Sequence, residues 1–281
     1  MSSEHDPRNR LNDLDAREWT YALRSVISTA YPTRGPESFA HHLRRQHPSP
    51  KPPQLMAELI RFFTRQHGHV LDPFAGVGGT LIASSLEGRT AVGIDLSAEY
   101  ATIYQAVCVE LQIAPQPYVV GDARNLLELP EVRERPFDLI LTDPPYAAMM
   151  TRPKTGERRK RGRPDPTPFT TSAADLGNLP YHEFIGELCT ILTAALQVLR
   201  PGGYLVLFAK DLQPTPEHHN MLHADLVIAL RQIPGLEYRG YRIWHDQSQR
   251  LYPFGYPYAF VANQMHQFIL IFRWRGDGVR F

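Results

Sequence analysis

Short apolar runs alternate with longer segments of helical periodicity through most of this 281-residue chain. The runs typical of strands lie at 69–71, 90–94, 118–120, 137–142, 204–209, 238–244 and 266–274. The segments typical of helices lie at 15–29, 53–66, 80–86, 98–111, 181–199 and 224–233. Because strands and helices alternate, we expect an α/β fold with a doubly wound sheet of about seven strands. The last two strands have no helical crossover between them, which predicts an antiparallel strand at the edge.

The same pattern predicts one main domain with a short region before it. A polar stretch over 1–12 and the helix at 15–29 predict an N-terminal tail and helix over 1–45. The main domain is expected over 46–281, since 43% of the residues are apolar and can form a large core. Long stretches without periodicity inside a compact domain usually carry function or lack a fixed structure. Two such stretches lie at 149–180 and 245–265.

Charge changes this picture only locally. The formal net charge is +1, which by itself gives no argument for a polyanionic partner. The insertion at 149–180, however, contains a run of basic residues that is interrupted by a single acidic residue, Glu157. These bases are Arg152, Lys154, Arg158, Arg159, Lys160, Arg161 and Arg163. The run is either a solvated loop or a phosphate-binding loop, and we favour the second over a minor-groove AT-hook at 160–164 (KRGRP).

Several classes of protein are not supported by the sequence. No apolar run approaches the roughly 20 residues of a membrane span, and the polar start lacks the core of a secretory signal, so a cytoplasmic protein is expected. The two cysteines, Cys108 and Cys189, support neither a disulfide framework nor a thiolate zinc site. His219 and His223 lack a third ligand and are expected to be surface histidines. We therefore expect no metal.

Four successive predicted strands end in an aspartate: Asp72, Asp95, Asp122 and Asp143. The carboxyl ends of parallel strands are where open α/β sheets place ligand chemistry. The first aspartate begins a glycine-rich bend, 72–80 (DPFAGVGGT), between a strand and a helix. A carboxylate at the end of the next strand is typical of ribose binding. The sequence therefore predicts a nucleotide-like ligand at this edge.

These segments together resemble the S-adenosylmethionine-dependent amino-methyltransferases that modify adenine N6 or cytosine N4 in DNA. The bend 72–80 is similar to their methionine-binding motif, and 143–146 (DPPY) is similar to their catalytic tetrapeptide. The stretch 47–52 (HPSPKP) resembles the segment beside the cofactor's methionine end, and 200–204 (RPGGY) the turn before their fifth strand. The resemblance extends over about 45–275, and it makes the main domain a Rossmann-like catalytic domain.

The resemblance implies a cofactor, S-adenosylmethionine, and a set of site residues. The implied cofactor-binding residues are Lys51, Asp72, Pro73, Phe74, Ala75, Gly76, Gly78, Asp95, Leu96, Asp122 and Ala123. The implied catalytic residues are Asp143, Pro144, Pro145 and Tyr146, and the nucleic-acid-binding residues are Arg158, Arg159, Lys160, Arg161 and Arg163. For Lys51 a solvated surface position is an equal alternative. Asp143 and the carbonyl of Pro144 would accept the hydrogens of the target amine, with Tyr146 stacked on a base flipped out of DNA.

Alternatives remain open at this point. Adenine N6 is favoured over cytosine N4 because Asp rather than Ser begins the tetrapeptide. A tRNA guanine-N2 methyltransferase shares this context, and a non-catalytic nucleic-acid-binding subunit would share the fold. Because no separate recognition domain is evident, sequence recognition is expected to come from the two long loops or from a recognition or restriction partner. The aromatic stretch 252–260 is either a stacking surface or a packed loop that plugs the end of the sheet, and we favour the packed loop.

Overall fold

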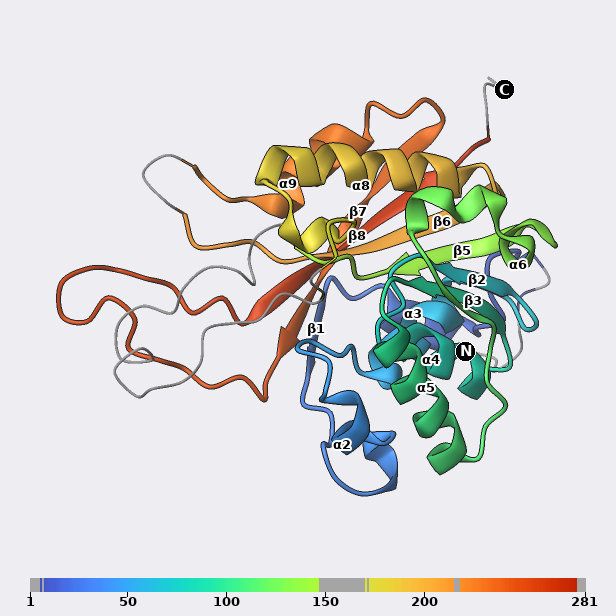
Figure 1. Ribbon diagram of the computed structural model, residues 1–281, viewed down its shortest axis with the longest axis horizontal. Helices are drawn as coiled ribbons and strands as arrows, with labels where there is room; N and C mark the ends of the chain where they lie inside the picture. Colours follow the sequence, from blue (N-terminus) through green and yellow to red (C-terminus); the bar gives the residue numbers. More distant parts are fainter. Residues whose placement is uncertain (1–5, 7, 147–169, 171, 215–217, 277–281) are drawn as a thin grey trace.

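The computed structural model of the protein describes residues 6, 8–146, 170, 172–214 and 218–276. Within this part, an eight-stranded sheet has the order β1-β7-β8-β6-β5-β2-β3-β4 (Figure 1). Its strands are β1 (Val26–Thr29), β2 (His69–Asp72), β3 (Thr90–Asp95), β4 (Tyr118–Val120), β5 (Phe137–Thr142), β6 (Leu199–Ala209), β7 (Leu236–Asp246) and β8 (His266–Trp274). Neighbouring strands are parallel except at β8, which is antiparallel to both β6 and β7. The expected α/β fold with a doubly wound sheet is confirmed.

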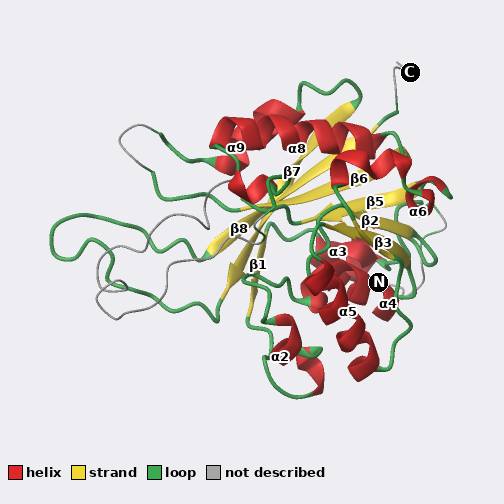
Figure 2. Ribbon diagram, in the orientation of Figure 1, coloured by secondary structure: helices red, strands yellow, loops and turns green. Residues whose placement is uncertain are grey.

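Helices cover both faces of this sheet (Figure 2). One hydrophobic core lies between the sheet and α3 (Pro53–Phe63), α4 (Gly79–Leu86) and α5 (Ala98–Leu111). A second core lies on the other face, under η2 (Ala123–Glu128), α6 (Pro130–Arg133), α8 (Tyr181–Leu196) and α9 (Leu222–Leu230). Short helical turns complete the described part, namely α1 (Ala16–Ala22), η1 (Pro36–Ser38), α2 (His41–Arg44) and η4 (Leu176–Asn178). The central strands are buried on both faces, which explains their continuous apolar runs.

The helix expected at 15–29 is wrong in its second half. A capping box begins α1, in which the Asp15 carboxylate accepts from the Glu18 backbone N–H and the Glu18 carboxylate accepts from that of Asp15. The helix ends at Ala22, and the β-branched run that follows forms β1, in which Ile27 is fully buried. Since β1 pairs with β7, it is β1 that occupies the edge of the sheet. The antiparallel strand β8 therefore lies inside the sheet and not at its edge.

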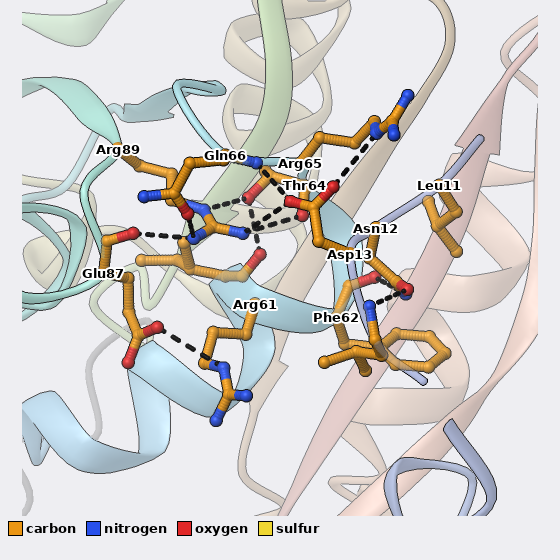
Figure 3. Close-up of polar contacts among 12 residues, drawn as sticks. Leu11, Asn12, Asp13, Arg61, Phe62, Thr64, Arg65, Gln66, Glu87 and Arg89 are labelled. Atoms are coloured by element: carbon orange, nitrogen blue, oxygen red, sulfur yellow. Dashed lines mark hydrogen bonds and ion pairs between the residues drawn. The ribbon is translucent and has the colours of Figure 1, made fainter. Parts of the chain in front are cut away.

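The N-terminal segment contacts the end of α3 through one buried hydrogen bond, from Asn12, and through exposed polar contacts of Asp13 (Figure 3). Asn12 donates from its side-chain amide to the carbonyl of Phe62 at 2.7 Å. Asp13 accepts from the Arg65 guanidinium at 3.2 Å. Arg89, also buried, donates to the hydroxyl and the carbonyl of Thr64, both at 3.1 Å. These bonds satisfy groups that burial would otherwise leave unpaired, and they hold the chain before α1 against the amino-terminal side of the sheet.

Candidate active site

A pocket lies at the carboxyl edge of the parallel strands and contains about 1020 Å³ of empty space, including the part open to solvent. All four strand-end aspartates line it, as the sequence predicts. From the predicted set, the pocket is lined by Lys51, Asp72, Pro73, Phe74, Ala75, Gly76, Asp95, Leu96, Asp122, Ala123, Asp143, Pro144, Pro145 and Tyr146. Gly78 is not among the lining residues.

Asp143 lies at the end of β5 with both carboxylate oxygens engaged. Lys51 donates from its ammonium group to Oδ2, and the Tyr146 hydroxyl donates to Oδ1. The side chains of Lys51 and Asp143 are 6% and 16% exposed, so this ion pair is largely removed from water. Burial, followed by the adjacent Asp143 carboxylate, holds the pKa of Tyr146 well above its usual value. The phenol is therefore a neutral donor to a carboxylate held by a lysine.

Lys51 is a buried site residue, and the surface alternative for it is wrong. It is 7% exposed, and its ammonium nitrogen lies 5.1 Å from the centre of the Phe208 ring. Its position follows from the chain just before α3, where Pro52 caps a helix that begins with Pro53. The Arg44 guanidinium holds this stretch by donating to the carbonyl of Lys51 at 3.0 Å. The segment after α2 thus delivers a cation to the end of β5, far away in sequence.

The Asp72 carboxylate accepts hydrogen bonds from other groups of the protein in this structure. Its carboxylate accepts from the backbone N–H of Phe74 at 3.1 Å and from the hydroxyls of Thr142 at 2.7 Å and Thr80 at 2.6 Å. These bonds join the start of the glycine bend to α4 and to the end of β5. Burial raises the pKa of Asp72 to about 6 despite the three donors. Asp72 therefore stabilises the bend, and its predicted contact with a cofactor stays a prediction.

The raised pKa of Asp72 makes stability depend on pH. An acid with a higher pKa in the folded state binds more protons there, so the free energy of unfolding falls as pH rises from about 4 to about 6 and is level above that. Two pKa units correspond to about 3 kcal/mol. We expect Asp72→Asn to be destabilised, because one amide oxygen cannot accept three bonds, and to lack this dependence. Urea unfolding from pH 4 to 7 measures both; a stability gap between the two proteins that is constant over this range contradicts the expectation.

The glycines of the bend are required by close approach to neighbouring side chains. A Cβ built on Gly76 would lie 3.3 Å from Nε2 of His47, and one on Gly78 would lie 2.2 Å from the Tyr104 ring. Both glycines have positive φ, 50° and 78°, a conformation that disfavours other residues. His47 packs edge-on against Tyr100, and burial lowers its pKa to about 4. The bend is thus enclosed by aromatic rings and a neutral imidazole.

We expect Gly78→Ala to lower the free energy of unfolding by about 3 kcal/mol, from overpacking and the left-handed backbone together. The matched control is Gly186→Ala in the middle of α8, where a Cβ meets nothing within 4 Å. That substitution should stabilise the protein by up to about 1 kcal/mol, because alanine favours a helix. Thermal and urea unfolding of the two variants measure both effects. Equal effects in the two variants would count against a tight bend.

Asp95 and Asp122 stand at the ends of the next two strands. Asp95 accepts from the backbone N–H groups of Gly76 at 2.8 Å and Ser97 at 2.9 Å, and burial raises its pKa. Asp122 accepts from the Arg124 guanidinium at 3.0 Å. The same guanidinium donates to the carbonyl of Ala174 at 2.9 Å, which ties the last part of the insertion at 149–180 to the rim of the pocket. Both carboxylates retain lone pairs for further donors.

The pocket also includes residues that sequence reasoning assigned no role. Tyr100, Asp175 and Leu176 line it, together with His47, which belongs to the predicted segment 47–52. Asp175 is buried and accepts from the backbone N–H of Thr170 at 2.9 Å. Its capping of η4 through the N–H of Gly177 at 2.8 Å follows the ordinary preference of Asp before a helical turn. That local signal was present in the sequence, but nothing in it placed the turn over the pocket.

The histidine prediction is correct for one residue and wrong for the other. His219 is more than half exposed, and its Nε2 lies 3.0 Å from the Asp225 carboxylate. His223 is largely buried, stacks on Phe268 at 3.8 Å between ring centres and contacts Asp211 at 2.8 Å. No group of three or more His, Cys, Asp or Glu side chains suited to a metal occurs among the residues that the structure describes.

The expected nucleic-acid-binding residues and a possible membrane-spanning helix can be compared with the structure only within the described residues. The predicted nucleic-acid-binding residues lie outside the described residues; these are Arg158, Arg159, Lys160, Arg161 and Arg163. No helix in the described ranges combines the length and apolar character needed to cross a membrane.

The first part of the chain matches a known protein family. Residues 6–106 match a family model described as DNA methylase, and this range contains the glycine bend, Lys51 and Asp95. Over 58 residues the chain is 38% identical to the type II methyltransferase M2.DpnII of Streptococcus pneumoniae, covering 21% of this chain and 22% of that protein. Over 105 residues it is 33% identical to a tRNA (guanine(10)-N2)-dimethyltransferase of Pyrococcus abyssi, covering 36% of this chain and 30% of that protein. The matched segments thus span less than a third of either relative.

A solved structure extends the fold comparison over most of the chain. The crystal structure of NSun6 from Pyrococcus horikoshii with SFG has a TM-score of 0.52 at 17% identity, covering 81% of this chain and 53% of that one. This likeness shows a Rossmann-like methyltransferase fold. The range that matches the family model contains the glycine bend and ends before the tetrapeptide that follows β5. Over residues 6–106, the chain is similar to the DNA methylase family.

Proposed function

We propose that this protein transfers a methyl group from S-adenosylmethionine to an exocyclic amino group of a base in DNA, with adenine N6 favoured over cytosine N4. The observation that carries the proposal is the largely buried carboxylate of Asp143, which faces the same pocket as the glycine bend. A carboxylate beside a cofactor pocket is what an amine acceptor needs for activation. The match to a family model described as DNA methylase supports the choice of DNA.

The residues around the bend fit the proposed cofactor. S-adenosylmethionine supplies an electrophilic methyl group on a positively charged sulfur. Gly76 lies close to His47, whose imidazole is neutral because burial lowers its pKa to about 4. Asp95 stands at the end of β3, where its carboxylate can accept from ribose hydroxyls. Phe74 and Leu96 add apolar surface to the same pocket.

On this proposal Asp143 activates the target amine. The nitrogen of an exocyclic amine is a poor nucleophile because its lone pair is delocalised into the ring. Asp143 and the carbonyl of Pro144 accept its hydrogens, and the carboxylate stabilises the positive charge that develops on nitrogen. The two prolines restrict the backbone that carries this carbonyl. Lys51 and Tyr146 each donate to one oxygen of Asp143, and the carboxylate retains lone pairs that can accept from the amine.

Tyr146 is buried and does not lie open for stacking on a base. Its side chain is 5% exposed and packs in the core cluster beneath α8. Its hydroxyl donates a hydrogen bond to Asp143. In the proposed reaction its first role is to hold the carboxylate in one rotamer, and stacking on a flipped base requires the pocket rim to open.

A second candidate is methylation of guanine N2 in tRNA. The specific observation in its favour is the match to tRNA (guanine(10)-N2)-dimethyltransferases of Pyrococcus abyssi and Methanocaldococcus jannaschii, each 33% identical over the aligned residues. An exocyclic amine is the acceptor in both reactions, so the same carboxylate chemistry applies. What separates them is the nucleic acid that reaches the pocket.

Incubation with methyl-labelled S-adenosylmethionine and separate pools of DNA and tRNA tests the proposal. We expect label in DNA, and digestion to nucleosides should identify N6-methyladenine. Label in tRNA alone would reject DNA as the substrate. Absence of label in both pools, in a protein that still binds the cofactor by calorimetry, would reject methyl transfer altogether.

A further inference from the structure

The loop between β7 and β8 presents three large aromatic side chains to solvent. Tyr256 is 81% exposed, Tyr258 is 93% exposed and Phe260 is 95% exposed. The packed loop that the sequence favoured over a stacking surface is therefore wrong for these residues. Side chains of this size and number are seldom left bare together on one loop without a role in binding.

The base of this loop is held by polar contacts. The Asn263 side chain accepts from the backbone N–H of Tyr252 and donates to its carbonyl, both at 2.8 Å. Gln264 donates to the carbonyl of Leu212 at 3.1 Å, which ties the loop to the segment after β6. Gly255 turns the tip with φ of 73°, and its carbonyl accepts from the Tyr258 N–H at 2.7 Å. The aromatic side chains thus extend from an anchored hairpin-like stem.

The stem places the three aromatics on the same edge of the sheet as the candidate active site. β7 is antiparallel to β8, which is antiparallel to β6, so β7 runs in the direction of β6 and β5. The loop after Asp246 therefore leaves from the carboxyl edge, where Asp143 ends β5. In Figure 1 this orange-red loop extends well beyond the ends of the strands on that side.

The composition of the loop suits one kind of partner. Residues 247–265 contain no acid and a single base, Arg250, so nothing in them repels a phosphate backbone. The aromatic faces of Tyr and Phe stack on nucleobases without sequence preference. A base that leaves the duplex for a pocket exposes the faces of its neighbours and its former partner, and those faces need a replacement for the lost stacking.

We propose that Tyr256, Tyr258 and Phe260 form an aromatic grip that stacks on unpaired or exposed bases of the nucleic acid substrate, beside the pocket that takes the target base. This inference rests on the proposed function, since it concerns the substrate of the same site. It assigns the grip a part in holding opened nucleic acid and none in the transfer of the methyl group.

The test compares the triple variant Tyr256→Ala/Tyr258→Ala/Phe260→Ala with the double variant Tyr21→Ala/Leu23→Ala. Tyr21 and Leu23 are also exposed, 62% and 60%. They lie before β1, which is parallel to β7, and therefore at the amino-terminal ends of the strands, away from the loop. Fluorescence anisotropy with a labelled single-stranded DNA oligonucleotide measures binding without cofactor. We expect the triple variant to bind at least about tenfold more weakly, since each stacked base contributes about 1–3 kcal/mol. The control should bind like the parent.

Steady-state kinetics give a second readout. On duplex DNA the triple variant should show a raised KM, and a mismatch at the target base should recover most of the loss, because that base is already unstacked. Unchanged binding and unchanged KM overturn the proposal, as does a triple variant that changes only self-association on a sizing column. Binding without cofactor is independent of methyl transfer, so failure of the proposed function and failure of the grip are separable results.

Discussion

Replacing Asp143 by alanine is expected to abolish methyl transfer while cofactor affinity changes by no more than a few-fold. On the proposed mechanism the carboxylate stabilises the charge that develops on the target amine, and groups of this kind contribute about a hundredfold or more to rate. Its contacts in the structure are with Lys51 and Tyr146 and not with the glycine bend. Labelled-methyl transfer and calorimetric titration with S-adenosylmethionine measure the two quantities on the same preparation.

The matched control for this experiment is Asp246→Ala. Asp246 ends β7 on the same edge of the sheet, but it does not line the pocket and its carboxylate accepts from Ser248. Its loss should leave the rate within about twofold, as for surface groups away from the chemistry. Turnover by Asp143→Ala at the parent rate would end the proposed role of this carboxylate. A rate loss of the same size in both variants would point to damage of the whole edge.

Lys51→Met is expected to be the most destabilising change in the pocket. It removes one partner of a largely buried ion pair and leaves the Asp143 carboxylate without its counter-ion. Breaking such a pair usually lowers the free energy of unfolding by about 3 kcal/mol or more. Methionine keeps the length of the side chain and its contact with Phe208, so loss of packing contributes little. Urea unfolding at neutral pH measures the effect.

A double-mutant cycle separates the ion pair from other effects. If Lys51 and Asp143 depend on each other, Lys51→Met combined with Asp143→Asn should be more stable than the sum of the two single losses predicts. The expected coupling energy is about 2 kcal/mol, since the double variant leaves no buried charge. Strict additivity would show that each side chain is stabilised by other groups, and the lysine would then be free to serve another ligand.

The arrangement around Asp143 has a consequence for the order of events in the proposed reaction. Each of the two donors takes one lone pair of the carboxylate, so a target amine can bind beside them or displace one of them. Of the two, Lys51 has the longer and more flexible side chain. The buried Tyr146 is held by the core around it. Withdrawal of the lysine is therefore the smaller rearrangement of the two.

Much of the fold was readable from local pattern. The helix at 98–111 and the strand at 266–274 have the bounds that periodicity predicts, because each is a single apolar pattern between clear breaks. Residues 26–29 were misassigned to a helix, since four residues are too short to show a period. What makes them a strand is pairing with β7, which lies more than two hundred residues away in sequence. Local propensity cannot report a partner at that distance.

The sequence by itself determined the chemical inventory of the site and the edge on which it lies. Strand-end aspartates, a glycine bend and a proline-rich tetrapeptide are local features, and parallel strands bring their carboxyl ends to one edge. Only the tertiary structure decided which side chains meet. It brought Lys51 onto Asp143, turned Asp72 inward and left Tyr256 in solvent. The physical reason is that burial and ion pairing depend on neighbours supplied by distant segments, and no periodicity along one segment encodes them.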